Sequence, residues 1–202
     1  SCVNALSTHL TAEIHREGKI FVQEFQKGVP MYSVKVVGET EDTGTIITFK
    51  PDAEIFTTST TYNYDILATR LRELAYLNKG IKLTLTDTRE DQLESEESEN
   101  GETVVKEKSE TFFSEKGLLE FVSYLDGTRE KLTESPIYLE TDKTGIPIEI
   151  AMQYNTGFSE NIHSYVNNIN TIEGGTHLSG FRRGLTSTLK SFAEKNGYLA
   201  KL

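Results

Sequence analysis

A glycine turn runs into a long amphipathic helix at Glu173-Gly174-Gly175-Thr176-His177-Leu178-Ser179-Gly180-Phe181-Arg182. Apolar side chains then recur every three or four residues as far as Phe192, which predicts a helix over 177–195. Thr176 is the expected N-cap, and Asn196-Gly197 is the expected end. The free N–H groups of a helix start attract anions, but an ordinary capped helix start explains the same pattern. The expected structural loop consists of Gly174, Gly175, Thr176 and His177.

Charge is distributed unevenly along the chain. Residues 176–202 include five basic side chains and one acidic side chain, whereas residues 87–115 include eleven acidic and three basic ones. The formal net charge of the whole chain, -10, therefore hides a basic C-terminal end. Arg182 and Arg183 lie one to two turns into the predicted helix, where they either reach a phosphate group or form a solvated face.

The rest of the chain mixes helices and strands without strict alternation, which predicts an α+β fold or an α/β sandwich. The spacing of leucines predicts helices over 62–78 and 115–125, and alternation of apolar and polar residues predicts strands. These strands are expected at 10–16, 20–26, 33–37, 45–49, 81–86 and 146–154, with a hairpin turn at Glu17-Gly18-Lys19.

The acidic segment 89–110 interrupts this pattern. It has too few large apolar side chains to offset the entropy of ordering it. We therefore expect a long mobile loop between two strands, and a domain boundary near residue 115. This boundary gives predicted domains over 1–115 and 116–202.

A glycine precedes a strand at Thr43-Gly44-Thr45-Ile46-Ile47-Thr48-Phe49. Glycine at such a point lets a ligand approach the backbone closely. Thr45 would then offer a hydroxyl group beside the apolar Ile47, and this combination suits an adenine-like ring. A turn followed by a buried strand is the alternative interpretation.

General catalytic motifs are missing from the sequence, which has no P-loop, no HExxH and no nucleophile elbow. The four histidines are scattered, so we expect no catalytic and no metal-ligating residue in this chain. Cys2 is the only cysteine, which excludes an internal disulfide, and we expect it to be a small core residue. No apolar run is long enough to cross a membrane. We therefore expect a cytoplasmic protein that does not bind membranes.

Several of these motifs occur in the order found in one enzyme family. The sequence resembles the ATPase subunits of bacterial type IIA DNA topoisomerases, which comprise the B subunit of gyrase and its topoisomerase IV counterpart. The resemblance covers nearly the whole chain, and no single motif decides it. The motifs are Val3-Asn4-Ala5-Leu6-Ser7, Gly28-Val29-Pro30, Thr43-Gly44-Thr45, Phe49-Lys50-Pro51-Asp52, Arg70-Leu71-Arg72-Glu73-Leu74-Ala75-Tyr76-Leu77-Asn78, Phe121-Val122-Ser123-Tyr124-Leu125, Tyr165-Val166-Asn167-Asn168-Ile169 and the 173–182 stretch.

This resemblance implies a fold and a set of residue roles. Residues 1–115 would be the C-terminal half of a GHKL (Bergerat) ATPase sandwich, and 116–202 an incomplete transducer domain with a fold like domain two of a ribosomal protein. Thr45 and Ile47 match adenine-binding positions, and Ser1 would lie at the edge of the pocket, just past the phosphate-binding lid. Arg182 matches the arginine that faces the cavity for DNA, and Arg183 is its neighbour.

The family's catalytic glutamate, Mg²⁺-binding asparagine and adenine-binding aspartate have no match here, and neither does its transducer lysine. The resemblance therefore implies a piece that lacks the N-terminal part and is inactive alone, with ATP and Mg²⁺ bound only in the intact protein. That protein would use ATP to pass one DNA duplex through another, in gyrase producing negative supercoils. Its partners would be DNA, the A protein of gyrase in an A2B2 heterotetramer, and a second copy in an ATP-dependent homodimer.

Three alternatives stay open. The first is the topoisomerase IV counterpart, which the sequence does not distinguish from the gyrase protein. The second is another GHKL ATPase of mismatch repair or of the chaperones. The third is a non-enzymatic interaction module whose C-terminal helix docks a partner; it explains the missing catalytic residues but not the order of the motifs.

Overall fold

The computed structural model describes residues 1–89, 94–97, 103–143 and 145–198. Contacts divide the chain into two compact units, Ser1–Tyr64 and Asp65–Leu202, which we call the N-terminal and C-terminal units. This division falls at a different place from the domain boundary expected near residue 115, which stays a prediction. None of the described helices is long and apolar enough to cross a membrane.

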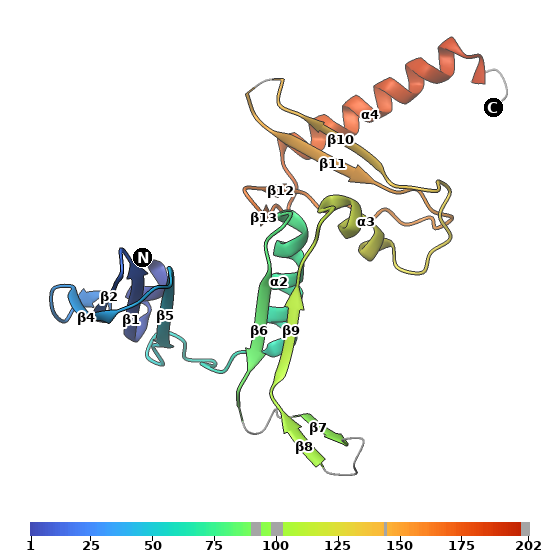
Figure 1. Cartoon of the computed structure of the whole chain (residues 1–202). Helices are drawn as coiled ribbons and strands as arrows, with labels where there is room; N and C mark the ends of the chain where they lie inside the picture. The colour runs from blue at the N-terminus through green and yellow to red at the C-terminus, as the bar shows by residue number, and fades with distance from the viewer. Residues whose placement is uncertain (90–93, 98–102, 144, 199–202) are drawn as a thin grey trace. The chain divides into compact units, whose positions relative to one another are not determined.

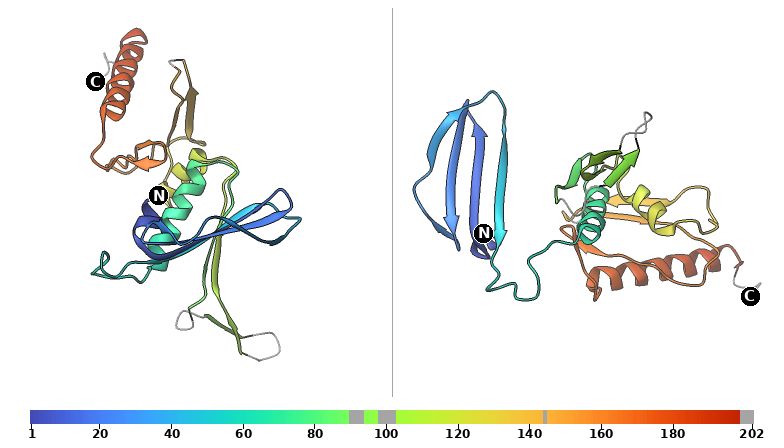
Figure 2. Two further views of the ribbon diagram at one scale, coloured as in Figure 1. Left: turned by 90° about the vertical axis from the view of Figure 1, so that its left-hand side faces the viewer. Right: turned by 90° about the horizontal axis from the view of Figure 1, so that it is seen from below.

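The N-terminal unit is one antiparallel sheet preceded by a short helix, α1 (Cys2–Ala5). Figure 2 shows its long strands side by side in a single layer. The strand order is β3-β2-β1-β5, and β4 also pairs with β2. The strands are β1 (Ser7–Arg16), β2 (Lys19–Gln26), β3 (Val29–Pro30), β4 (Lys35–Glu39) and β5 (Gly44–Pro51).

Tight turns fix the register of this sheet. Glu17 and Gly18 have φ angles of 55° and 75°, so the predicted hairpin turn closes with two left-handed residues. That conformation matches the right-handed twist of the flanking strands, and it pairs Arg16 directly with Lys19. The structure confirms the strands expected at 10–16, 20–26, 33–37 and 45–49, with ends that differ by up to three residues.

The C-terminal unit begins along α2 (Tyr64–Leu77) and contains short two-stranded ladders and two further helices (Figure 1). The helices are α3 (Leu118–Asp126) and α4 (Thr176–Lys195). The antiparallel ladders are β6 (Leu83–Asp87) with β9 (Lys108–Phe112), β7 (Glu94–Glu97) with β8 (Thr103–Lys106), β10 (Ile137–Thr141) with β11 (Ile148–Met152), and β12 (Tyr165–Val166) with β13 (Ile169–Asn170).

The core of this unit lies where α2 meets α3. Ala75 and Phe121 are buried, and the ring of Tyr76 stacks on Phe121 with 5.1 Å between centroids. Phe112 of β9 is also buried, and the guanidinium group of Arg72 lies over its ring. The helices predicted over 62–78 and 115–125 are confirmed, with ends that differ by up to three residues.

Four expectations need correction. Within the supposed loop 89–110, the described residues form β7, β8 and part of β9, while 90–93 and 98–102 lie outside the described residues. The strand expected at 146–154 is confined to Ile148–Met152. The N-cap of α4 is Gly175, and Thr176 is already the first helical residue. Cys2 is exposed, because α1 buries none of its residues.

Candidate functional site

Thr45 and Ile47 lie on one face of the sheet in the N-terminal unit. In the register with β1, Thr45 is opposite Ile14 and Ile47 is opposite Ala12. Alternate residues of a strand point to the same side, so the Thr45 hydroxyl group and the Ile47 side chain share a face. We call this the Thr45 face. Its other members from the paired strands are Leu10, Ala12, Ile14, Phe21, Gln23, Phe25 and Phe49.

The Thr45 face is apolar and open. Leu10 and Tyr64 are the only buried apolar residues in 1–64, a range that the structure describes completely. Ile47 keeps 50% of its surface exposed, and Phe49 has an edge-on contact with the ring of Tyr62. A hydroxyl group beside an open apolar surface is the arrangement expected of one wall of a site for a planar ring.

Ser1 is not brought next to Thr45 by this sheet. Ser1 is the N-cap of α1, and its carbonyl oxygen accepts a hydrogen bond of 3.1 Å from the N–H of Ala5. The strand that follows α1 pairs Ser7 with Pro51, which is the opposite end of β5 from Thr45. The role of Ser1 at the edge of a nucleotide pocket stays a prediction.

A buried carboxylate fixes the chain as it leaves β5. Asp52 accepts a hydrogen bond of 3.0 Å from the N–H of Glu54, and its other oxygen lies 3.2 Å from Nζ of Lys27. The Glu54 N–H and then the Lys27 ammonium keep the pKa of Asp52 below its usual value. Its backbone N–H also donates to the carbonyl oxygen of Leu6, at 3.0 Å. This contact ties the end of β5 to the residue before β1.

The glycine loop before α4 positions a histidine. Gly174 has a φ of 76°, and a Cβ atom on Gly175 would lie 2.7 Å from Cε1 of His177. The His177 ring therefore packs against the Gly175 backbone, with Nε2 lying 3.2 Å from Oγ1 of Thr171. Gly174, Gly175, Thr176 and His177 form one loop and helix start, and their structural role there stays a prediction.

Arg182 and Arg183 are both exposed on α4 but differ in their contacts. Arg182 donates a hydrogen bond of 2.7 Å from Nη2 to Oε2 of Glu160, and the two side chains of this ion pair are 52% and 63% exposed. Arg183 has no ion pair within the part of the chain that the structure describes. Both arginines are exposed to solvent, and their role in facing DNA stays a prediction.

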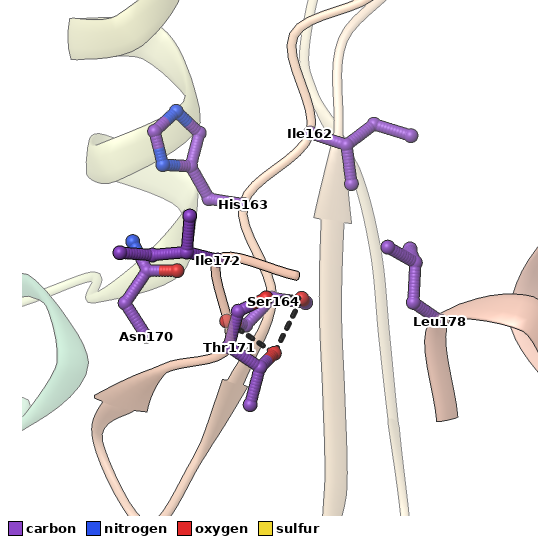
Figure 3. A pocket seen from close by; sticks show the side chains of 7 residues that line it. All are labelled: Ile162, His163, Ser164, Asn170, Thr171, Ile172 and Leu178. Atoms are coloured by element: carbon purple, nitrogen blue, oxygen red, sulfur yellow. Dashed lines mark hydrogen bonds between the residues drawn. The ribbon is translucent and has the colours of Figure 1, made fainter. Parts of the chain in front are cut away.

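A pocket of about 200 Å³ lies between the β12–β13 hairpin and the first turn of α4 (Figure 3). Figure 3 shows the hydroxyl groups of Ser164 and Thr171 turned toward each other, 2.6 Å apart. These groups satisfy each other across the base of the hairpin, and Ile162 and Leu178 supply apolar walls. The polar groups of the pocket are thus hydrogen-bonded to each other, and we assign no ligand to it. Nothing in the sequence predicted this pocket.

A partly buried polar junction joins α2 to the same hairpin. The hydroxyl group of Tyr165 donates to Glu73, which also forms an ion pair with Arg70. Arg70 in turn donates to the carbonyl oxygen of Asn168, at 2.8 Å, and the side-chain amide of Asn168 donates to that of Asn78, at 2.8 Å. Burial and then the bond to Glu73 raise the pKa of Tyr165. The 70–78 and 165–169 motifs were both recognised in the sequence, but neither motif indicated that it contacts the other.

Bacterial DNA gyrase B proteins are similar to the whole of this chain. The relative from Cytophaga aurantiaca is 54% identical over 202 residues, and that from Halalkalibacterium halodurans is 51% identical over 196, which are 100% and 97% of this chain. A family model described as DNA gyrase B matches residues 117–202. The chain belongs to the DNA gyrase B family.

The fold of this gyrase B family chain matches a solved relative. It is similar to the 43K ATPase domain of Thermus thermophilus gyrase B, crystallised in complex with an aminocoumarin, with a TM-score of 0.77 and 32% identity. The match covers 96% of this chain and 49% of the other. The predicted fold class, an α+β chain of the GHKL type, is thereby confirmed. The chain spans 40% of the length of the Cytophaga relative and 28% of the Halalkalibacterium relative.

Proposed function

We propose that this chain is the part of a type IIA DNA topoisomerase, in the B protein of gyrase, that links ATP binding to DNA strand passage. The observation that carries the proposal is the joint occurrence of the gyrase B fold and an open apolar face bearing the Thr45 hydroxyl group. Residues 1–115 would then be the ATPase part and 116–202 the transducer part. ATP would close two ATPase parts into a dimer, and the transducer would pass this change to the DNA-cleaving core as a rigid-body movement.

The Thr45 face fits one side of an adenine ring. Thr45 supplies one hydroxyl group that can bond to a ring nitrogen or to a water molecule, and Ile47 supplies an apolar surface. Among the described residues, no group of three histidine, cysteine or acidic side chains could hold a metal ion. We propose that Mg²⁺, like ATP, is bound by the intact protein.

The isolated chain is expected to show no ATPase activity and no stabilisation by a non-hydrolysable ATP analogue, because one wall of a site gives little affinity. A complete site at a hundredfold excess of nucleotide over Kd would stabilise the folded chain by about 2.7 kcal/mol. A thermal-shift titration measures this directly. A saturable rise in Tm that disappears in Thr45→Val would contradict the expectation, because it would show an intact site in the chain.

The proposed DNA contact lies on α4 and is electrostatic. We expect Arg183→Ala to weaken binding to duplex DNA of any sequence and to lower the slope of log Kobs against log salt by about 1. Fluorescence anisotropy at several salt concentrations gives this slope. Arg16→Ala, which also removes an exposed arginine, is the control. Equal slopes for the two variants would show that Arg183 does not contact DNA.

The other proposed partners follow from the family. They are the A protein of gyrase in an A2B2 heterotetramer and a second copy in an ATP-dependent homodimer, acting in the cytoplasm. The relatives named here favour this function over a mismatch-repair ATPase, a chaperone ATPase or an interaction module. Supercoiling of relaxed plasmid by the complete protein together with the A protein tests the proposal. A plasmid that stays relaxed would point instead to topoisomerase IV.

A further inference from the structure

Lys79 reaches from the end of α2 to the β10–β11 hairpin. It lies two residues after the last helical residue, Leu77, and its Nζ atom is 2.9 Å from the hydroxyl oxygen of Tyr138 and 2.8 Å from Oε1 of Glu149. Tyr138 belongs to β10 and Glu149 to β11. One ammonium group therefore contacts both strands of a hairpin that is about 60 to 70 residues away in sequence.

The hairpin carries two like charges opposite each other, and this ammonium group neutralises one of them. Glu140 and Glu149 are directly opposite each other in the β10–β11 register, and like charges in that position destabilise a ladder. The Tyr138 hydroxyl oxygen lies 2.9 Å from Glu140 and 2.7 Å from Glu149. A hydroxyl group has one proton and can donate to only one carboxylate at a time. The two carboxylates carry two negative charges, and the Lys79 ammonium group, which lies 2.8 Å from Glu149, neutralises one of them.

The stem of Lys79 is held in place by its surroundings. A Cβ atom on Gly117, at the start of α3, would lie 2.6 Å from Cγ of Lys79, so the absence of a side chain at Gly117 makes room for the lysine. The next residue, Gly80, donates its N–H to the carbonyl oxygen of Ser114 at 2.9 Å. The ammonium group therefore projects from a fixed base, and Glu149 and then Tyr138 raise the pKa of Lys79.

These contacts are suited to fixing an orientation and add little to stability. The side chains of Lys79 and Glu149 are 42% and 32% exposed, so water competes for both charges. Ion pairs with that degree of exposure contribute little to the free energy of unfolding. Their geometry is nevertheless specific, because groups from two strands converge on one atom.

We propose that Lys79, Tyr138, Glu140 and Glu149 form a charge clamp that holds the β10–β11 hairpin in one orientation relative to the end of α2. Lys79 is a positioning residue, because it touches neither nucleotide nor DNA in the proposed function. The consequence for activity rests on that proposed function. The hairpin lies in the proposed transducer and Lys79 in the proposed ATPase part, so the clamp would carry movement between them.

The clamp is tested by measuring the distance between two spin labels, one at Thr69→Cys on α2 and one at Lys143→Cys in the turn of the hairpin. The exposed Cys2 is first replaced by serine. We expect one narrow distance distribution in the otherwise unchanged chain and a broader distribution in Lys79→Met. The exposed neighbour Lys82→Met is the control and should keep the narrow peak.

Two further variants separate the clamp from a general loss of folding. Tyr138→Phe removes only the hydroxyl group and should broaden the same distribution, while the circular dichroism spectrum stays unchanged. Adding Glu149→Gln to Lys79→Met removes the uncompensated repulsion and should restore part of the narrow peak, a coupling between neighbours that independent sites do not show. A distribution that stays narrow in Lys79→Met and in Tyr138→Phe overturns the proposal.

The same Lys79→Met change in the complete protein, assayed together with the A protein, tests the consequence for activity. We expect ATP turnover to be kept while the number of supercoils introduced per ATP falls. Turnover and supercoiling that stay coupled would overturn the relay role even if the hairpin moves. A lack of supercoiling by the unmodified protein would overturn the proposed function instead, and the distance measurement would still decide the clamp.

Discussion

Phe121→Ala is expected to lower the free energy of unfolding of the C-terminal unit by about 3–5 kcal/mol. Phe121 is 6% exposed, stacks on Tyr76 at 5.1 Å and lies 6.3 Å from the ring of Tyr165. Truncation would leave a cavity where α2, α3 and the β12–β13 hairpin meet, and aromatic rings cannot collapse into it without losing their contacts.

Urea unfolding followed by far-UV circular dichroism measures this loss, because the chain has no tryptophan. Phe158→Ala is the matched control, since the Phe158 side chain is fully exposed and its removal should change stability by less than about 0.5 kcal/mol. Similar midpoints for the two alanine variants would show that Phe121 does not lie in the core.

Gly117→Ala should destabilise the chain more than Gly127→Ala, although both glycines flank α3 in nearly the same backbone conformation. Their φ and ψ angles are 59° and -121° for Gly117, and 60° and -126° for Gly127. Any L-residue is strained in this region, by a free energy of order 1–3 kcal/mol at each position. Only at Gly117 does the added methyl group also collide with a neighbour, the stem of Lys79.

The difference between the two variants therefore isolates the steric demand of the lysine stem. Urea midpoints give the difference, and the double variant Lys79→Ala with Gly117→Ala should bring the loss back to that of Gly127→Ala. An equal loss for both single glycine variants would show that Lys79 has room to move aside, and would weaken the argument that its stem is held.

Local patterns were enough to predict most individual elements. Alternation gave β1, β2 and β5, and the leucine spacing gave α2 and α3, because these signals depend on neighbours within one or two turns. The hairpin turn at Glu17 and Gly18 was visible for the same reason. The β7–β8 ladder was missed because its acidic composition is typical of a solvated loop, and in this case backbone pairing outweighed composition.

The long-range contacts of the candidate sites could not be read from the sequence. Thr45 and Ile47 share a face because of their spacing, which was foreseeable. The Tyr165–Glu73 bond and the Lys79–Tyr138 bond join residues that are 92 and 59 positions apart. No periodicity encodes such pairs. The pairing of Arg182 with Glu160, 22 positions apart, is of the same kind.

The exposed edge of β5, the last strand of the N-terminal sheet, favours aggregation of the chain. On its outer edge β5 has no neighbour among the described residues, and Ile46, Ile47 and Phe49 are exposed on its two sides. An edge of this kind is a template for pairing with another polypeptide, and Lys50 is the only charged residue on it. Concentrated solutions should therefore form sheet-rich aggregates. The substitution Ile46→Lys should delay their appearance.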